Sequence, residues 1–109
     1  MNRTDDDEHD AVTDPRLLLL SPNDNILVLR GAIDGGERIQ IDGLEIFIKE
    51  HIGLGHKLAC QVIASGNKVL KYGVSIGSAT GDIGIGDHVH VHNMKSDYIP
   101  TYVLEDEGG

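Results

Sequence analysis

The sequence predicts a single, mostly β domain built from short strands joined by glycine turns. Fourteen of its 109 residues are glycine, a content that favours turns and close backbone approaches and disfavours long helices. A turn pattern also recurs three times, and each copy carries the β-branched residues that strands prefer. A chain of this length is expected to form one domain with a modest core.

The recurring pattern occupies residues 32–43, 62–73 and 82–93, which align without a gap. Each copy has an Ile, a Gly three positions later, a polar residue, a β-branched Ile or Val, and a final Gly or Asn. Glycine tolerates the positive φ of a tight turn, and a β-branched residue favours the returning strand. Each copy is therefore predicted to be a strand end, a tight turn and a returning strand.

The elements outside the repeat are also predicted to be strands. Residues 16–20 and 26–29 are apolar runs separated by turn formers at 21–25, which predicts a hairpin. Residues 44–52 alternate like a strand at their start and are ambiguous at their end, so a helical turn there stays open. Residues 58–63 are predicted to form a strand behind a glycine-containing loop.

Negative charge is concentrated at the two ends of the chain. Residues 1–14 have a net charge of −5 and residues 105–107 of −3, which leaves only −1 of the total −9 for the middle. We expect residues 1–14 to be an acidic, disordered tail and residues 15–97 to form the domain. Residues 98–109 combine two tyrosines and a proline with the second acidic run, and we expect them to be a docking segment and tail.

The composition argues against several classes of protein. The chain lacks the clustered Lys and Arg that neutralise phosphates, so no nucleic-acid partner is expected. No apolar run is long enough for a signal segment or a membrane span. Cys60 is the single cysteine and has no internal disulfide partner. We therefore expect a cytoplasmic protein that does not bind membranes.

Three histidines alternate with valines at the end of the third repeat: His88, His90 and His92. In an extended strand they would line one face, with Val89 and Val91 on the other. His88 and His90 could bind a metal ion, the three could protect an edge strand, or one could transfer protons while the others orient it. Proton transfer is favoured, because no second Cys or His cluster supplies further metal ligands.

Two other places carry candidate polar side chains. The loop at residues 53–57 presents His56, which can transfer protons near neutral pH, and Lys57, which can bind a carboxylate. Lys71 and Tyr72 end the second repeat, and Tyr72 is equivalent to His92 if the copies superpose. Ordinary solvated side chains would explain either pair taken alone.

Five segments together resemble the SAF domain of the altronate and galactarate dehydratase family. The resemblance extends from about Ile26 to Asn93 and is weaker before Gly53. It implies a β-clip fold, in which a long hairpin bends over on itself, and a small subunit that acts beside a large catalytic one. The segments are Gly55–Ala59, Val69–Gly73, Ile76–Thr80, Asp82-Ile83 and His88–Asn93.

The resemblance implies a hydro-lyase that removes water from an aldonic or aldaric acid to give a 2-keto-3-deoxy acid. It also implies a divalent metal, iron or manganese and sometimes calcium, held mainly by the large subunit. The expected partners are that subunit and the sugar acid, and a homo-oligomer is also compatible with the sequence. Our hypothesis assigns proton transfer or metal contact to His56, His88, His90 and His92, and substrate binding to Lys57, Lys71, Tyr72 and Asn93.

Two alternatives stay open at this point. A similar small subunit belongs to sulfolactate sulfo-lyase, which eliminates sulfite by related chemistry. The chain would otherwise be a non-catalytic module that binds sugar acids or stabilises a large partner.

Overall fold

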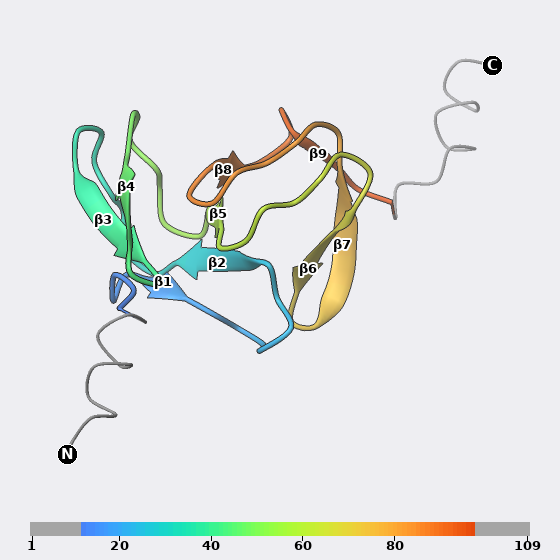
Figure 1. The fold of residues 1–109 in the computed structure, drawn as a ribbon, viewed down its shortest axis with the longest axis horizontal. Coiled ribbons are helices and arrows are strands. Elements are labelled where there is room, and N and C mark those ends of the chain that lie inside the picture. Colours follow the sequence, from blue (N-terminus) through green and yellow to red (C-terminus); the bar gives the residue numbers. More distant parts are fainter. Residues whose placement is uncertain (1–11, 98–109) are drawn as a thin grey trace.

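The computed structural model describes residues 12–97, and within them the fold is entirely β. Nine short strands form three antiparallel sheets in this range (Figure 1). The prediction of a mostly β domain with short strands and glycine turns is therefore confirmed. Nothing in residues 12–97 forms a helix of the length and apolarity that crossing a membrane requires.

The central sheet has four strands, and a hairpin lies on either side of it (Figure 1). The predicted first hairpin is confirmed, with Leu17 paired to Leu29, although its first strand is shorter than residues 16–20. The central strands, in spatial order, are β1 (Leu17–Leu18), β2 (Ile26–Leu29), β5 (Lys57–Ala59) and β8 (His88–Val89). The flanking strands are β3 (Arg38–Ile41) with β4 (Leu44–Phe47), and β6 (Lys68–Lys71) with β7 (Val74–Ala79) and β9 (Met94–Lys95).

Each face of the central sheet packs against one of the hairpins. Cross-strand partners share a face, so Leu58 and its partners Leu27 and His88 lie on one face. That face forms an apolar cluster with β3, including Ile39 and Ile41. The opposite face forms a second buried cluster with the other hairpin, made of Ile26, Ala59, Ile63, Val69, Ala79, Ile83 and Val89.

The three predicted turn repeats are present, and the structure adds a fourth copy at residues 52–58. In all four the turn glycine has a positive φ, between 85° and 93°. The residue after each glycine donates its N–H to the carbonyl three positions earlier, as His56 does to Gly53. The fourth copy escaped the sequence pattern because it ends in buried Leu58, which is not β-branched.

The four turns form two pairs, which makes the second half of the domain a repeat of the first. Ile33 exchanges two backbone hydrogen bonds with Ile52, and Ile63 exchanges two with Ile83. Ile63 lies 30 positions after Ile33, whereas Ile83 lies 31 positions after Ile52, so the second half contains one extra residue. A bulge at Ile76, between the pairings Val69 with Gly77 and Leu70 with Ser75, accommodates the extra residue. The two halves thus cover opposite faces of the central sheet.

The predicted continuous strand through His88, His90 and His92 is wrong. β8 ends at Val89, and Val91 is 77% exposed instead of packing on the opposite face. Asn93 causes the break, because its side-chain oxygen accepts the His90 N–H and its own N–H donates to the His90 carbonyl, which closes a turn.

The structure decides two further points that the sequence left open. Tyr72 and His92 are not equivalent, since Tyr72 has a positive φ of 57° in the turn between β6 and β7. No helical turn forms at residues 49–52, where the backbone of Ile52 pairs with Ile33 instead. The first difference arises from the tight turn between paired Lys71 and Val74, and the second from backbone pairing between distant segments, which local propensity does not report.

Candidate histidine site

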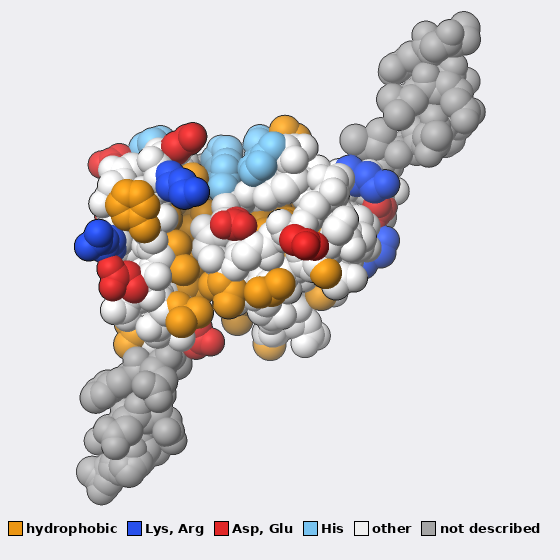
Figure 2. All heavy atoms as spheres, turned by 45° about the horizontal axis from the view of Figure 1, so that its top comes forward, with side chains coloured by type: hydrophobic (Ala, Val, Ile, Leu, Met, Phe, Trp, Pro, Cys, Tyr) orange, Lys and Arg blue, Asp and Glu red, His pale blue; other side chains and the backbone are white. Residues whose placement is uncertain are grey.

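The pairing of β5 with β8 brings His56 close to the histidines that follow Gly86. His56 immediately precedes β5, and Leu58 in that strand pairs with His88. The His56 Nδ1 and His88 Nε2 atoms are 2.9 Å apart. The His56 and His90 ring centroids are 5.1 Å apart, and the His88 and His90 rings stack at 5.4 Å. Figure 2 shows histidine side chains gathered together at one edge of the surface.

Burial and neighbouring groups lower the pKa of His88, which favours its neutral form. Burial is the largest cause, and electrostatic interactions with His56, His90, His92 and Lys57 add to it. At 2.9 Å one ring nitrogen must donate a hydrogen to the other, so His56 and His88 do not both present N–H groups to each other. A neutral imidazole is the form that binds a metal or accepts a proton.

His56, His88 and His90 are a suitable donor set for a transition metal. One ring nitrogen from each lies within 4.8 Å of the other two. Imidazole nitrogen suits iron, whereas calcium prefers oxygen ligands and manganese favours carboxylates. The three side chains therefore match iron better than manganese or calcium, the other two metals that the resemblance implies. The group includes His56, which the alternating pattern alone does not place with His88 and His90.

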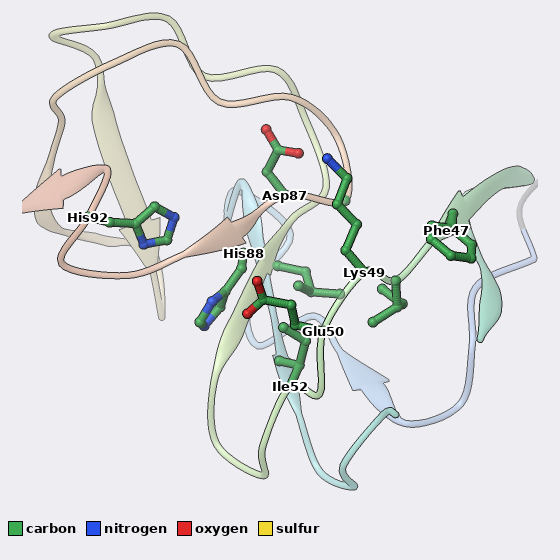
Figure 3. Close-up of a pocket in the computed structure, with 10 residues that line it drawn as sticks. Phe47, Lys49, Glu50, Ile52, Asp87, His88 and His92 are labelled. Carbon is green, nitrogen blue, oxygen red and sulfur yellow. The ribbon is translucent and has the colours of Figure 1, made fainter. Parts of the chain in front are cut away.

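His92 lies outside this group of three and lines a hollow beside it. Its ring centroid is 5.7 Å from that of His88. The hollow has a volume of about 430 Å³ and is also lined by His88 and by the buried apolar residues Ile48, Ile52 and Leu58 (Figure 3). This is the size range of small-molecule sites.

The candidate lysines lie apart from the histidine group. Lys57 pairs with Val28 and Val89, on the face of the central sheet opposite His88. Its pKa is lowered, first by burial and then by the charge of Lys71. Lys71 contacts the face of Tyr72, 5.9 Å from the ring centroid, and the Tyr72 ring is 67% exposed. The structure thus groups Lys57 with Lys71 and Tyr72, away from the hollow.

Asn93 supports the histidine turn through its side chain. Its Nδ2 donates to the His88 carbonyl at 2.9 Å, and its Oδ1 accepts the His90 N–H at 2.9 Å. These two bonds orient the backbone that carries the histidines. They use one N–H and one lone pair of the amide, so the assignment of Asn93 to substrate binding stays a prediction.

Three polar residues of the hollow were not among the sequence candidates: Lys49, Glu50 and Asp87. Lys49 and Glu50 connect buried Ile48 to Ile52, and the ambiguous pattern of residues 44–52 concealed their place beside the histidines. Asp87 occupies the polar position of the third turn repeat, directly after Gly86, and this position is the sequence feature from which it could have been predicted.

The chain matches the family model described as the altronate/galactarate dehydratase SAF domain over residues 15–97. The chain belongs to this family. The match includes both pairs of turns, the central sheet and all four histidines of the site. The recognition made from the sequence motifs is therefore confirmed.

Individual relatives fall into two groups. The chain is 45% identical to altronate dehydratase of Bacillus subtilis over 73 residues, which are 67% of this chain but 15% of that protein. It is 45% identical to (2R)-sulfolactate sulfo-lyase subunit alpha of Chromohalobacter salexigens over 53 residues, 49% of this chain and 56% of that subunit. The subunit alpha of Paracoccus pantotrophus is 44% identical over 48 residues, 44% of this chain and 72% of that subunit. The SAF domain thus occurs both in long lyases and in small lyase subunits.

Proposed function

We propose that this chain is the small component of a lyase that removes water from a polyhydroxy acid, with its histidine site completed by a larger partner. The observation that carries the proposal is the convergence of His56, His88 and His90 beside a hollow that His92 also lines. A structural role would not require three imidazoles with ring nitrogens within 4.8 Å of one another and a fourth ring 5.7 Å from that of His88. The family supports elimination from an acid as the reaction.

A partner is proposed because two of the relatives are named subunit alpha of a sulfo-lyase, a name that implies a second subunit. The chain's match spans more than half of each of these subunits and 15% of the Bacillus subtilis altronate dehydratase. A domain of this size buries too little surface to enclose a substrate on all sides. The open hollow beside the histidines is the surface on which a larger catalytic chain would close.

The reaction divides its tasks among the four histidines. His56, His88 and His90 would hold a divalent ion, for which iron is the best match, and the ion would act as a Lewis acid toward substrate oxygens. His92 lies outside that donor group and is assigned to proton transfer, an effect worth roughly 10² to 10⁴ in rate. Loss of the proton α to the carboxylate and departure of the protonated β-hydroxyl as water give an enol, which tautomerises to the 2-keto-3-deoxy acid.

Elimination of sulfite is the second candidate function. Two of the relatives are named subunit alpha of (2R)-sulfolactate sulfo-lyase. In that reaction the carbon–sulfur bond breaks and sulfite leaves in place of water. The same proton abstraction α to a carboxylate would serve both reactions.

Co-purifying the chain with a large lyase chain from the same organism would test the proposal. Native mass spectrometry should show both chains in one complex, and assays on altronate, galactarate and sulfolactate should identify one acid that is consumed. His92→Ala should reduce turnover by about 10² or more without dissociating the complex. His51→Ala is the matched control, because His51 pairs with Asp34 at an exposed position. Full activity of the large chain alone would instead support a non-catalytic module.

A further inference from the structure

The two halves of the domain differ at one strand edge. β7 pairs with β6 on one side and with β9 on the other, whereas its counterpart β4 pairs with β3 alone within residues 12–97 (Figure 1). After the bulge the two halves are offset by 31 positions, so residues 47–49 correspond to residues 78–80. In the described part of the chain, the first half therefore lacks a counterpart of β9.

The backbone is arranged alike at the corresponding positions of the two halves. Ile48 donates its N–H to the Glu37 carbonyl, as Ala79 does to the carbonyl of Asn67. In an antiparallel pair, positions that bond to the partner strand alternate with positions that do not, so the N–H and C=O of Phe47 point away from β3. The outer edge of β4 thus presents unpaired backbone groups.

β9 shows how the second half uses this kind of edge. Ser78 pairs with Lys95, and the Thr80 N–H donates to the Asn93 carbonyl at 2.9 Å. The Lys49 N–H corresponds to that of Thr80 and has no acceptor within residues 12–97. Because an open strand edge binds an extended chain through such groups, the edge of β4 is available for a further strand.

The hollow beside the histidines lies where the counterpart of β9 would run. Residues 47–50 form one of its sides, and buried Ile48 belongs to its apolar floor. In the second half the equivalent residue is Ala79, which pairs with Met94 and belongs to the buried cluster that Met94 packs against. A strand added to β4 is therefore expected to place an apolar side chain opposite Ile48.

Close contacts hold the open edge in a fixed position. A Cβ at Gly35 would lie 2.9 Å from the Lys49 carbonyl oxygen and 3.2 Å from the Glu50 Cα, so the first turn packs on this segment only because Gly35 has no side chain. Gly86 approaches the end of β4 in the same way, since a Cβ on it would lie 2.5 Å from Cγ2 of Ile46. An edge that is already ordered loses less conformational entropy when it binds a strand.

The shape of the hollow restricts what can occupy it. In Figure 3 Phe47 lies on one side, and His88 and His92 lie on the other. Paired strands are about 4.8 Å apart, so a single extended segment fits along this edge, whereas the edge of a second copy would bring its own histidine wall against this one. The described part of the chain ends at Asp97, which pairs with Lys68 on the other hairpin, away from this edge.

We propose that an extended segment of the larger partner chain binds along residues 47–50 as a third strand of the β3–β4 sheet, as β9 binds to β7. Its backbone forms hydrogen bonds with Phe47 and Lys49, and one of its apolar side chains covers the floor of the hollow at Ile48. The inference rests on the proposed function for the existence of that partner. Strand addition at this edge brings the partner chain up to the histidines and thereby completes the shared site.

Amide hydrogen exchange tests the inference at single residues. The full 109-residue chain is measured alone and in its complex with a large lyase chain from the same organism. Exchange at Phe47 and Lys49 should slow by about tenfold or more in the complex, because both N–H groups become hydrogen-bonded. Glu45 lies on the same edge but outside the hollow, so its amide should exchange at the same rate in both samples.

Two substitutions at one position separate the backbone from the side chain. Lys49→Ala removes the side chain and keeps the N–H, whereas Lys49→Pro removes both. Lys49→Pro should form the complex roughly fivefold more weakly than Lys49→Ala does, the effect of losing one hydrogen bond. Glu45→Pro is the matched control for proline on this edge and should bind the large chain as the wild type does. Urea unfolding checks that each variant is folded.

The outcomes separate this inference from the proposed function. Unchanged exchange at Phe47 and Lys49 in an active complex, or equal affinities of Lys49→Pro and Lys49→Ala, would overturn the inference alone. Slow exchange of both amides in the isolated chain would also overturn it, and a dependence on protein concentration would then identify a second copy as the occupant instead of another segment of the same chain. If no complex forms, both proposals fail. A protected edge in a complex that turns over no acid would remove the proposed function and leave the inference standing.

Discussion

His56 Nδ1 lies 2.9 Å from His88 Nε2, although 32 positions separate the two residues. The contact exists because β5 and β8 are neighbours in the central sheet. It joins the loop histidine to the alternating histidines and creates the three-nitrogen group.

If this group binds a metal, the purified chain should bind Co²⁺ with one ion per chain and a visible absorption band. His56→Ala and His88→Ala should each weaken binding by roughly tenfold or more, because each removes one of three nitrogens. His51→Ala should bind normally, since His51 contacts Asp34 instead. Titration followed by absorbance measures all four proteins, and equal affinities would exclude the histidine group as the site.

Gly86→Ala should destabilise the fold more than Gly66→Ala. Both glycines have a φ of 89° at the same turn position, so both variants incur the cost of a left-handed residue, about 1 kcal/mol. A Cβ at Gly66 meets open space, whereas at Gly86 it meets Ile46, and we expect a total loss of about 3 kcal/mol there. Urea unfolding measures both. Equal losses of unfolding free energy in the two variants would mean that β4 moves away from residue 86 at no energetic cost.

Asp24→Ala should cost roughly 3 kcal/mol of unfolding free energy. The Asp24 side chain is buried, and its two oxygens accept the N–H groups of Tyr72 and Gly73 at 2.9 and 2.7 Å. Removal leaves both donors without their acceptor. Asp82→Ala is the control, because exposed Asp82 accepts one N–H, from Ser65, and should cost less than about 1 kcal/mol. Chemical denaturation compares the two, and a loss at Asp24 no larger than at Asp82 would contradict the prediction.

Arg16→Gln should lower the Tm by a few degrees at pH 6 and by less at pH 3. Hydrogen bonds from the Arg16 side chain are the main cause of the lowered pKa values of Asp14 and Glu37. These carboxylates bind protons more weakly in the folded state, so their stabilising effect is present above the ordinary carboxylate pKa and is lost as the pH falls through the folded values. Thermal melts at several pH values measure this. If the Tm difference between the wild type and Arg16→Gln grew toward pH 3, Arg16 would stabilise the fold by something other than its bonds to Asp14 and Glu37.

Much of the architecture was predictable from short-range patterns. The spacing of Ile33, Gly36 and Ile39 recurs at Ile63, Gly66 and Val69, and the positive φ of each glycine is the reason for it. The fourth repeat was harder to recognise, because buried Leu58 stands where the others have Ile or Val. The role of Leu58 in the repeat depends on its position in the central sheet, which the residue type alone does not reveal.

The sequence by itself determined the β fold, the turn positions and the four histidines, because glycine conformation and alternation act over a few residues. Only the tertiary structure decided which of these side chains meet. It joined His56 to His88, placed Lys57 on the other face of the sheet, and brought Lys49, Glu50 and Asp87 around one hollow. The physical reason is that strand pairing and the close approaches at Gly35 and Gly86 link segments tens of residues apart, beyond the reach of any local pattern.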